Sequence, residues 1–568
     1  MAGRLGYAAN SQVWGEINPN LSSDLNAFGQ TLFDPAPFEI ASRIGQGGYS
    51  SYRLPGANRW PIAGSMQPAF MQDFYFRIHV VPAVLDVGNV VSEQVHDVVI
   101  WNAYLTSNTL EDLSGENTEG VILSGQPNPP FAFAPLAELV WKVAVTPDGP
   151  PTVEAVFTWQ FTGEPPVQMA VVGNRITAWT FSPDWSDGVT ELLSWLTDIL
   201  PSEIGVEQRR GLRDLPRRAF EFPILASGRD RALLDLALFG WGARIWALPI
   251  WHDVQWLPGV VQGSTEVLCE TAHRDFSDGG LALLLGDGAA EYEVLEVLTV
   301  ESDRLQLRSA VASDWPTTVR LYPVRSARLT DQPRMRRVSD NTVRAGISFQ
   351  VEDYTGWDHT YTLPDYRGWP VLEMRPAETG DLTLSYTRLL QVLDNDISAP
   401  YVEDTADLGF TVQAHRWLME GAEERSQFRG YCYTQSGRQK AVWLPSWMDD
   451  LTLAAPFAAG GTSLDVEHVQ YGRFAGAKMG RRDLRIELRD GSIWYRRVTG
   501  SLELDSETER LGLETFIDQA FDPADVWRIS WMALMRLDSD QVEIKHTTDI
   551  DGAASAQLLY RGVRDDDI

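Results

Sequence analysis

The residues able to do chemistry are spread along the chain without a recognisable catalytic or metal-binding spacing. Histidine and cysteine are the side chains most often used as metal ligands, nucleophiles and proton carriers near neutral pH. No two histidines fall at ligand spacing with a cysteine, aspartate or glutamate on one helix, so we expect surface or core roles and no metal site. The histidines are His79, His96, His252, His273, His359, His415, His468 and His546.

The sequence also carries none of the short motifs that mark an active site. It has no H-E-x-x-H, no G-x-S-x-G and no Walker motif, and Cys269 and Cys432 are expected to be reduced core thiols. A glycosidase pair of carboxylates, about 5 to 10 Å apart, stays open because acids are abundant and sequence gives no pairing. Asp253 and Asp449 recur at equivalent places and are better read as turn or cap residues. We expect no enzyme activity and no cofactor.

A cluster of arginines stands out in a chain whose net charge is −31. The charge disfavours nucleic acid, because a phosphate backbone would be repelled. Guanidinium groups pair well with carboxylates of an acidic neighbour, so a subunit interface is the favoured reading. Changing Arg217 and Arg218 to Glu should then block assembly and leave the monomer folded. The candidate interface residues are Arg209, Arg210, Arg213, Arg217 and Arg218, with Trp251 and Trp447 as buried anchors.

The chain repeats a six-residue pattern. Residues 248–253 read Leu-Pro-Ile-Trp-His-Asp and residues 444–449 read Leu-Pro-Ser-Trp-Met-Asp, at an offset of 445 − 249 = 196 residues. Further echoes follow in the same order, where Arg304-Leu305 matches Arg510-Leu511 at 206 and Arg320-Leu321 matches Arg528-Ile529 at 208. An offset that drifts slowly while the order is kept is what loop insertions produce. The pattern predicts an internal duplication.

The elements expected around this pattern are a strand, a helix and a second strand. In the first copy a basic loop (207–210) precedes a strand near Phe220, a helix covers 230–239 and an apolar strand covers 243–251. In the second copy the helix is expected at 421–433 and the final strand at 441–447. Each copy is followed by a stretch of alternating apolar and polar residues, which is typical of small β barrels or sandwiches.

The first copy resembles the distal tail protein family of long-tailed bacteriophages and gene transfer agents. The matching residues are Glu207, Gln208, Arg209, Arg217, Arg218 and Phe220, followed by residues 240–251. The resemblance covers roughly 80 residues, and the Glu-Gln-Arg-Arg segment is not recognisable in the second copy. It implies a structural protein of a tail tip or baseplate.

A second resemblance concerns residues 69–165. Short alternating strands, for example Phe74-x-Phe76-x-Ile78-x-Val80, with frequent turns are typical of a sandwich. The order Asp86-Val87-Gly88-Asn89-Val90, then Asn102, then residues 120–125, is similar to immunoglobulin-like domains. The N-terminal 68 residues, rich in Gly, Pro, Asn and Ser, are expected to form an extended arm.

The expected fold class is mainly β with a few short helices in a multi-domain chain. We expect an immunoglobulin-like sandwich, a duplicated tail-tube-like module and small β-barrel or sandwich domains, because 568 residues with 44% apolar content can form several cores. The 21 tryptophans are expected to fill thin β cores, and sugar-stacking platforms are the alternative. The boundaries are arm 1–68, sandwich 69–165, modules 166–256 and 353–450, and small β domains 257–352 and 451–568, the last with an acidic tail.

The tail resemblance implies partners and a location. Two tube-like modules in one chain would let a trimer present six modules, and a hexamer of chains is the other closed ring to consider. The implied partners are tail-tube or tail-terminating proteins and hub, spike or fibre proteins, without nucleic acid or membrane insertion. The start of the chain lacks a signal-peptide pattern, so assembly in the host cytoplasm and residence in the virion are expected. The alternative is a glycan-binding or glycan-cleaving virion or surface protein.

Overall fold

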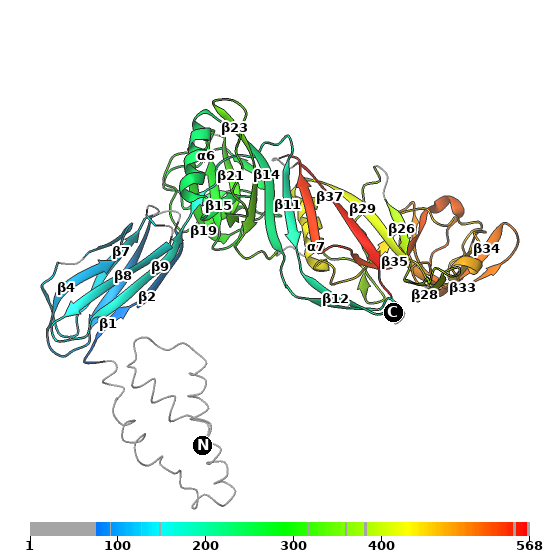
Figure 1. The fold of residues 1–568 in the computed structure, drawn as a ribbon, viewed down its shortest axis with the longest axis horizontal. Helices are drawn as coiled ribbons and strands as arrows, with labels where there is room; N and C mark the ends of the chain where they lie inside the picture. Colours follow the sequence, from blue (N-terminus) through cyan, green and yellow to red (C-terminus); the bar gives the residue numbers. More distant parts are fainter. Residues whose placement is uncertain are drawn as a thin grey trace, which may run out of the picture. The chain divides into compact units, whose positions relative to one another are not determined.

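The computed structural model describes residues 75–564 except 91–92, 126–127, 147–148, 151, 316–317, 358–360, 380–382 and 549–551. The expected arm at 1–68 and the acidic end at 565–568 lie outside the described residues. The described chain is mainly β and multi-domain, as predicted, and divides into two compact units, Met1–Thr177 and Ala178–Ile568 (Figure 1). Within these ranges no helix has both the length and the apolar character to cross a membrane.

The described part of the first unit is a two-sheet sandwich with one shared core. Both sheets bury alternate residues, and Trp141 of one sheet meets Trp159 of the other edge to face at 6.0 Å. The four-stranded sheet has the order β1 (Ile78–Val81), β3 (Gln94–Asn102), β7 (Glu138–Val145), β5 (Val121–Ser124). The five-stranded sheet has the order β2 (Val84–Val90), β9 (Val167–Arg175), β8 (Thr152–Phe161), β4 (Asn108–Glu116), β6 (Phe131–Phe133).

Two residues of the immunoglobulin-like pattern have local structural roles. Gly88 has a φ of 60° at a bulge in β2, and its N–H donates to Asp86 at 2.9 Å. Asn102 is buried and donates to the carbonyl oxygens of Thr106 and Ala134. The strand β9 completes the sandwich, so this unit extends past the expected boundary at residue 165.

The second unit contains the same sequence of elements twice. We call residues 189–351 repeat 1 and residues 384–562 repeat 2. Repeat 1 comprises β11 (Val189–Ser194), β12 (Thr197–Pro201), β13 (Glu207–Gly211), β14 (Arg217–Ser227), α6 (Gly228–Trp241), β15 (Ile245–Pro249), η3 (Trp251–Asp253), β16 (Gln255–Leu257), β17 (Glu266–Leu268), β18 (Leu281–Leu285), β19 (Tyr292–Val300), β20 (Arg304–Leu307), β21 (Val319–Leu329), β22 (Arg336–Arg337) and β23 (Thr342–Val351).

Repeat 2 follows a linker with a short β24–β25 hairpin (Asp365–Tyr366 and Trp369–Pro370). Its elements are β26 (Leu384–Thr387), β27 (Leu390–Leu393), β28 (Tyr401–Asp404), β29 (Phe410–Glu420), α7 (Gly421–Gln435), β30 (Val442–Pro445), β31 (Gly461–Glu467), α8 (Tyr471–Phe474), β32 (Asp483–Leu488), β33 (Ile493–Glu503), β34 (Thr508–Ile517), η4 (Pro523–Asp525), β35 (Val526–Leu537), β36 (Gln541–His546) and β37 (Ala553–Gly562).

Strand register matches the two repeats residue by residue. Ser194 pairs with Arg217 in repeat 1 and Thr387 pairs with Phe410 in repeat 2, each at an offset of 193 residues (387 − 194 and 410 − 217). The hairpins β12–β13 and β27–β28 keep that offset, and so do the glycines of positive φ that start α6 and α7, Gly228 and Gly421. The first part of the module is therefore duplicated without insertion or deletion.

The later strands match with larger offsets, as the sequence pattern predicted. Pro249 pairs with Val324, and Pro445 pairs with Met532, so the strands β21 and β35 are related by 532 − 324 = 208 residues. The bulge in β19 between Val297 and Thr299 recurs in β33 between Val498 and Gly500. A shared bulge is a conserved detail of backbone geometry. It confirms that the echoed motifs come from one duplicated fold.

Strand pairing crosses the boundaries expected at residues 257 and 451. The strands β21 and β23 pair with β15 and β14, so β17 to β20 form an insertion within repeat 1 with a separate core. The strands β31 to β34 form the equivalent insertion in repeat 2. The pairings among the described strands of this unit form an open, branched sheet and close into no barrel.

Candidate functional site

The two repeats meet at the edge strand β11, which is shared between them. On one side β11 pairs with β14 of repeat 1, and on the other it pairs with β36 of repeat 2, so that Glu191 lies opposite both Phe220 and Ile544. Burial alternates along β11, and its inward positions are Val189, Glu191 and Leu193. The strand therefore points a carboxylate into the interior where the repeats join.

Glu191 is the centre of a buried charge network. Its carboxylate has no exposed surface and accepts hydrogen bonds from Arg218 Nε at 2.7 Å, Arg429 Nη2 at 2.6 Å and His546 Nε2 at 3.1 Å. Arg218 comes from β14, Arg429 from α7 and His546 from the end of β36. One carboxylate thus ties a strand of repeat 1 to a helix and a strand of repeat 2.

The network continues into repeat 1 through a second carboxylate. Arg218 also pairs with Asp275, which accepts from Arg325 Nη2 at 2.6 Å. Asp253, the last residue of the repeated Leu-Pro-x-Trp-x-Asp pattern, accepts from Arg274 at 2.9 Å and from the Asp275 N–H at 2.8 Å. The turn role expected for Asp253 is therefore combined with a buried ion pair.

These contacts determine the charge states of the carboxylates. Desolvation alone would raise the pKa of Glu191, but Arg218, Arg429 and His546 hold it well below its usual range. Desolvation is likewise outweighed at Asp275, where Arg218 and Arg325 lower the pKa to about 2. Both groups are therefore ionised across the physiological range.

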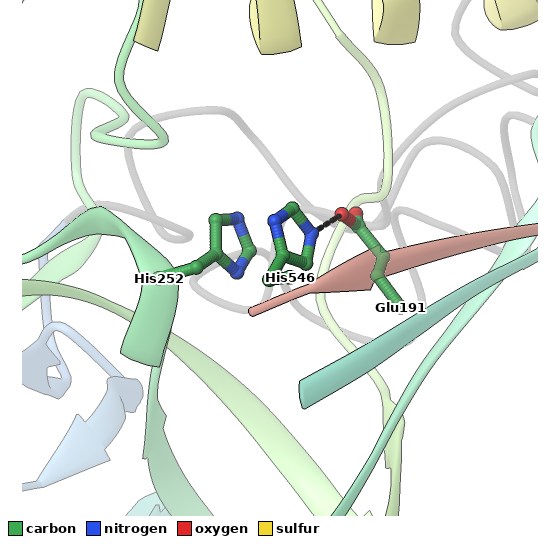
Figure 2. A group of neighbouring side chains, drawn as sticks. All are labelled: Glu191, His252 and His546. Atoms are coloured by element: carbon green, nitrogen blue, oxygen red, sulfur yellow. Dashed lines mark hydrogen bonds and ion pairs between the residues drawn. The ribbon is translucent and has the colours of Figure 1, made fainter. Parts of the chain in front are cut away.

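Two histidines stack against each other beside Glu191. The rings of His252 and His546 are parallel within 3° with centroids 3.6 Å apart, and His546 lies between His252 and the carboxylate (Figure 2). Arg429 Nη2 lies 3.3 Å from His252 Nε2, and because a guanidinium only donates, that nitrogen accepts. Desolvation lowers the pKa of His546 to about 4 and that of His252 well below its usual value. Both rings are neutral at pH 7.

The histidine pair makes stability dependent on acid. In the unfolded chain each histidine binds a proton near pH 6.5, whereas folded His546 does so only near pH 4. The unfolded state therefore gains protons first, and stability is expected to fall between pH 6.5 and 4, by about 3 kcal/mol for His546 alone. Urea unfolding at pH 7.5, 6, 5 and 4.5 measures this loss. His546→Gln should flatten the profile and His96→Gln should not, and equal profiles for all three proteins would contradict the assignment.

The Glu191–His252–His546 group places one ligand atom from each residue within 4.8 Å of the others, which is a spacing that a metal ion could use. The surroundings do not fit a cation. Both oxygens of Glu191 already accept from guanidinium groups, and the positive charges of Arg429 and Arg425 lower the pKa of both histidines. Parallel stacked rings also direct their lone pairs side by side rather than to one point. The arrangement is better suited to joining the repeats.

A hairpin adds a second contact between the repeats. β12–β13 extends from β11 across repeat 2 (Figure 1), where Arg536 forms two hydrogen bonds of 2.7 Å with Glu207. Asp540 accepts from the Thr197 N–H at 2.8 Å and from Arg438 Nε at 3.1 Å. Gly205 at the hairpin tip lies so close to Phe410 that a Cβ there would be 2.4 Å from its ring. We call β12–β13 the clasp hairpin.

The structure separates the arginines that the sequence grouped together. The Glu207–Arg210 segment, expected as a loop, is the strand β13, on which Arg209 is half-buried and Arg210 is exposed. Arg213 donates to the Ser194 carbonyl at 2.8 Å. Arg217 and Arg218 are neighbours on β14 and so point to opposite faces, the first exposed and the second buried.

The expectation that Arg217 and Arg218 can both be changed to Glu without loss of the fold is wrong for Arg218. A glutamate at 218 would lie beside Glu191 and Asp275 in a site closed to water. Arg217 alone is an accessible surface residue. The tryptophan anchors are buried within their own repeats, where Trp251 meets Tyr322 edge to face and Trp447 lies under the Arg485 guanidinium.

Sequence reasoning missed Glu191, His252, His546 and Arg429 as one group. They come from four elements separated by up to 355 residues, so no local spacing connects them. One signal was present. Glu191 takes an apolar position in the Val189-x-Glu191-x-Leu193 alternation, and a charge on the buried face of a strand requires a partner.

Comparisons with known proteins add little to this geometry. No protein-family model matches the chain, and no curated protein matches its sequence. Among solved structures, the secreted serine protease VesC from Vibrio cholerae is 10% identical over 47% of this chain, with a TM-score of 0.15, and the chain spans 48% of its length. The phage phi92 endosialidase is 10% identical over 85% of this chain and 75% of that one, with a TM-score of 0.13. Likenesses this weak carry no argument.

Proposed function

We propose that the chain is a structural component of a bacteriophage tail tip, in which its repeats form part of a ring joining the tail tube to hub, spike or fibre proteins. The observation that carries the proposal is the join between the repeats, where two copies of one fold recognise each other edge to edge through β11, β36 and the clasp hairpin. A module that binds its own copy in a directional way is the unit from which rings are built.

The chemistry of the join supports a structural role. Glu191, His252 and His546 are all buried, so the most perturbed group of titratable residues among those described has no path for a substrate. The resemblance of residues 207–220 to distal tail proteins points the same way. The residues that carry it, Glu207 and Arg218, both make contacts that hold the repeats together.

No described feature favours the glycan alternative. That reading called for clustered exposed tryptophans beside two close acids. Among the described tryptophans, only Trp256 and Trp527 are more than a third exposed, and they lie in different repeats. Each is covered in part by arginine, Arg320 over the first and Arg375 with Arg489 over the second.

Immunoelectron microscopy tests the proposed function. Gold-labelled antibody against the purified first unit is expected to bind one end of the tails of particles in a lysate in which the chain is produced. The same antibody after absorption with the purified chain is the control, and should leave the tails bare. Tailed particles that stay unlabelled, with all of the chain in the soluble fraction, would contradict a tail-tip location.

A further inference from the structure

We propose that repeat 2 of one chain binds repeat 1 of a second copy in the same way that repeat 1 binds repeat 2 within the chain. The strand β26 and the hairpin β27–β28 would provide one side of this contact, and residues 332–337 with α6 would provide the other. The inference gives the proposed ring its contact surface, and it stands or falls on self-association alone.

The argument begins with two edges that lack partners within the described chain. β11 of repeat 1 pairs on both sides, with β14 and β36, whereas its counterpart β26 pairs only with β29. In the same way β36 pairs with β11 and β37, whereas its counterpart β22 pairs only with β23. One edge of each kind is thus used inside the chain, and one of each kind is left over. An unpaired strand edge is a ready site for a further strand.

Exposure changes at the matched positions as a missing partner would require. Leu193 is fully buried, but its counterpart Tyr386 is 58% exposed. Ile544 is 2% exposed, but Met335, the residue that takes its place 209 positions earlier (545 − 336), is 39% exposed. Apolar residues are kept at these positions although water reaches them.

The clasp hairpin has an unused counterpart. β27–β28 has the same register as β12–β13, yet its strands are exposed along almost their whole length. Its exposed apolar residues are Leu390, Val392, Leu393, Ile397, Tyr401 and Val402. Since the clasp hairpin lies on repeat 2, the β27–β28 hairpin is expected to lie on repeat 1 of the neighbour. Arg217 occupies the position of Phe410 there, which gives Arg217 the interface role predicted from sequence.

The helices show the same asymmetry. α7 buries eight residues and faces the join, where Arg429 meets Glu191 and Tyr433 meets Trp195. α6 buries only Leu234, and its Phe239 is 93% exposed. A helix face that is apolar and uncovered marks a protein contact.

Charge selects the orientation. The free edge of repeat 1 carries Arg334, Arg336 and Arg337, all exposed, in a chain of net charge −31. The β27–β28 hairpin of repeat 2, residues 390–404, holds four acids and no basic residue. Basic and acidic edges attract each other, while two copies of either edge repel. The contact is therefore head-to-tail, which builds a ring when the rotation closes.

The register predicts which residues lie opposite each other between chains. Glu191 faces Ile544 within the chain, so Leu384 of one copy should face Met335 of the next. A chain with Leu384→Cys is mixed with a chain with Met335→Cys and oxidised. The expected product is a covalent dimer that neither variant gives alone. The two native cysteines are buried and so give little background.

The control replaces Val338, which is exposed but three residues out of register, by cysteine in the second chain. The dimer yield with Val338→Cys is expected to be at least ten-fold lower. No mixed dimer, or equal yields with both partners, would overturn the proposal. Labelled tails without cross-linking would leave the proposed function standing without this contact. Cross-linking with unlabelled tails would support the contact and reject the tail-tip location.

Discussion

A chain in which Arg334, Arg336 and Arg337 are replaced by glutamate is expected to be monomeric. The three side chains are exposed, so the fold is retained, but the free edge of repeat 1 then repels the acidic β27–β28 hairpin of its neighbour. Like charges across an interface cost several kcal/mol, which is enough to abolish an assembly of ordinary affinity. Light scattering of variant and wild type at equal concentration measures the effect.

A matched control reverses the same amount of charge elsewhere. Arg308, Arg473 and Arg489 are exposed and lie in the insertions, away from both free edges, and their replacement by glutamate should leave assembly intact. A second variant, Tyr386→Asp with Leu384→Asp, disables the opposite edge and should also be monomeric. Each variant retains one working edge, so their mixture is expected to stop at a dimer. Larger species in the mixture, or assembly by either variant alone, would contradict a head-to-tail contact.

Replacing Glu191 by glutamine is expected to loosen the join between the repeats by about 3–5 kcal/mol, the usual cost of breaking a buried ion pair by removing one partner. Arg218 would keep Asp275, but Arg429 would lose its carboxylate while remaining buried. Hydrogen exchange of the β11 and β36 amides measures the loss locally, which suits a chain of several domains better than one unfolding curve. The amides should exchange about a hundred-fold faster or more.

The control is Glu543→Gln, which lies on β36 in the same join but is exposed. It should change exchange little, because surface charges contribute at most about 1 kcal/mol. If Glu191→Gln exchanged like Glu543→Gln, the buried network would not be what holds the repeats together.

The sequence predicted the elements and the duplication because both leave local signals. Apolar periodicity placed α6 and α7, and the Leu-Pro-x-Trp-x-Asp pattern gave the 196-residue offset that Pro249 and Pro445 confirm in strand register. The expected barrels did not form, and the boundary at 257 was misplaced, because β21 and β23 return to the first sheet after an insertion. Such returns depend on long-range pairing, which local pattern does not encode.

The join itself depended on tertiary contacts that spacing does not carry. Glu191 and His546 meet only because β11 pairs with β36. The division of Arg217 from Arg218, however, was available from sequence. Arg218 alternates with Phe220 and Phe222 on the buried face of one strand, so a period of two already places Arg217 outside.

The most direct measurement of the central claim is the mass of the purified wild-type chain in solution, by light scattering over a range of concentrations. The account predicts a closed assembly at a fixed multiple of 63.5 kDa, with three chains and therefore six repeats as the expected number and six chains as the other closed ring. A chain that stays at 63.5 kDa at every concentration would contradict it, because both free edges would then be surfaces that no second copy binds.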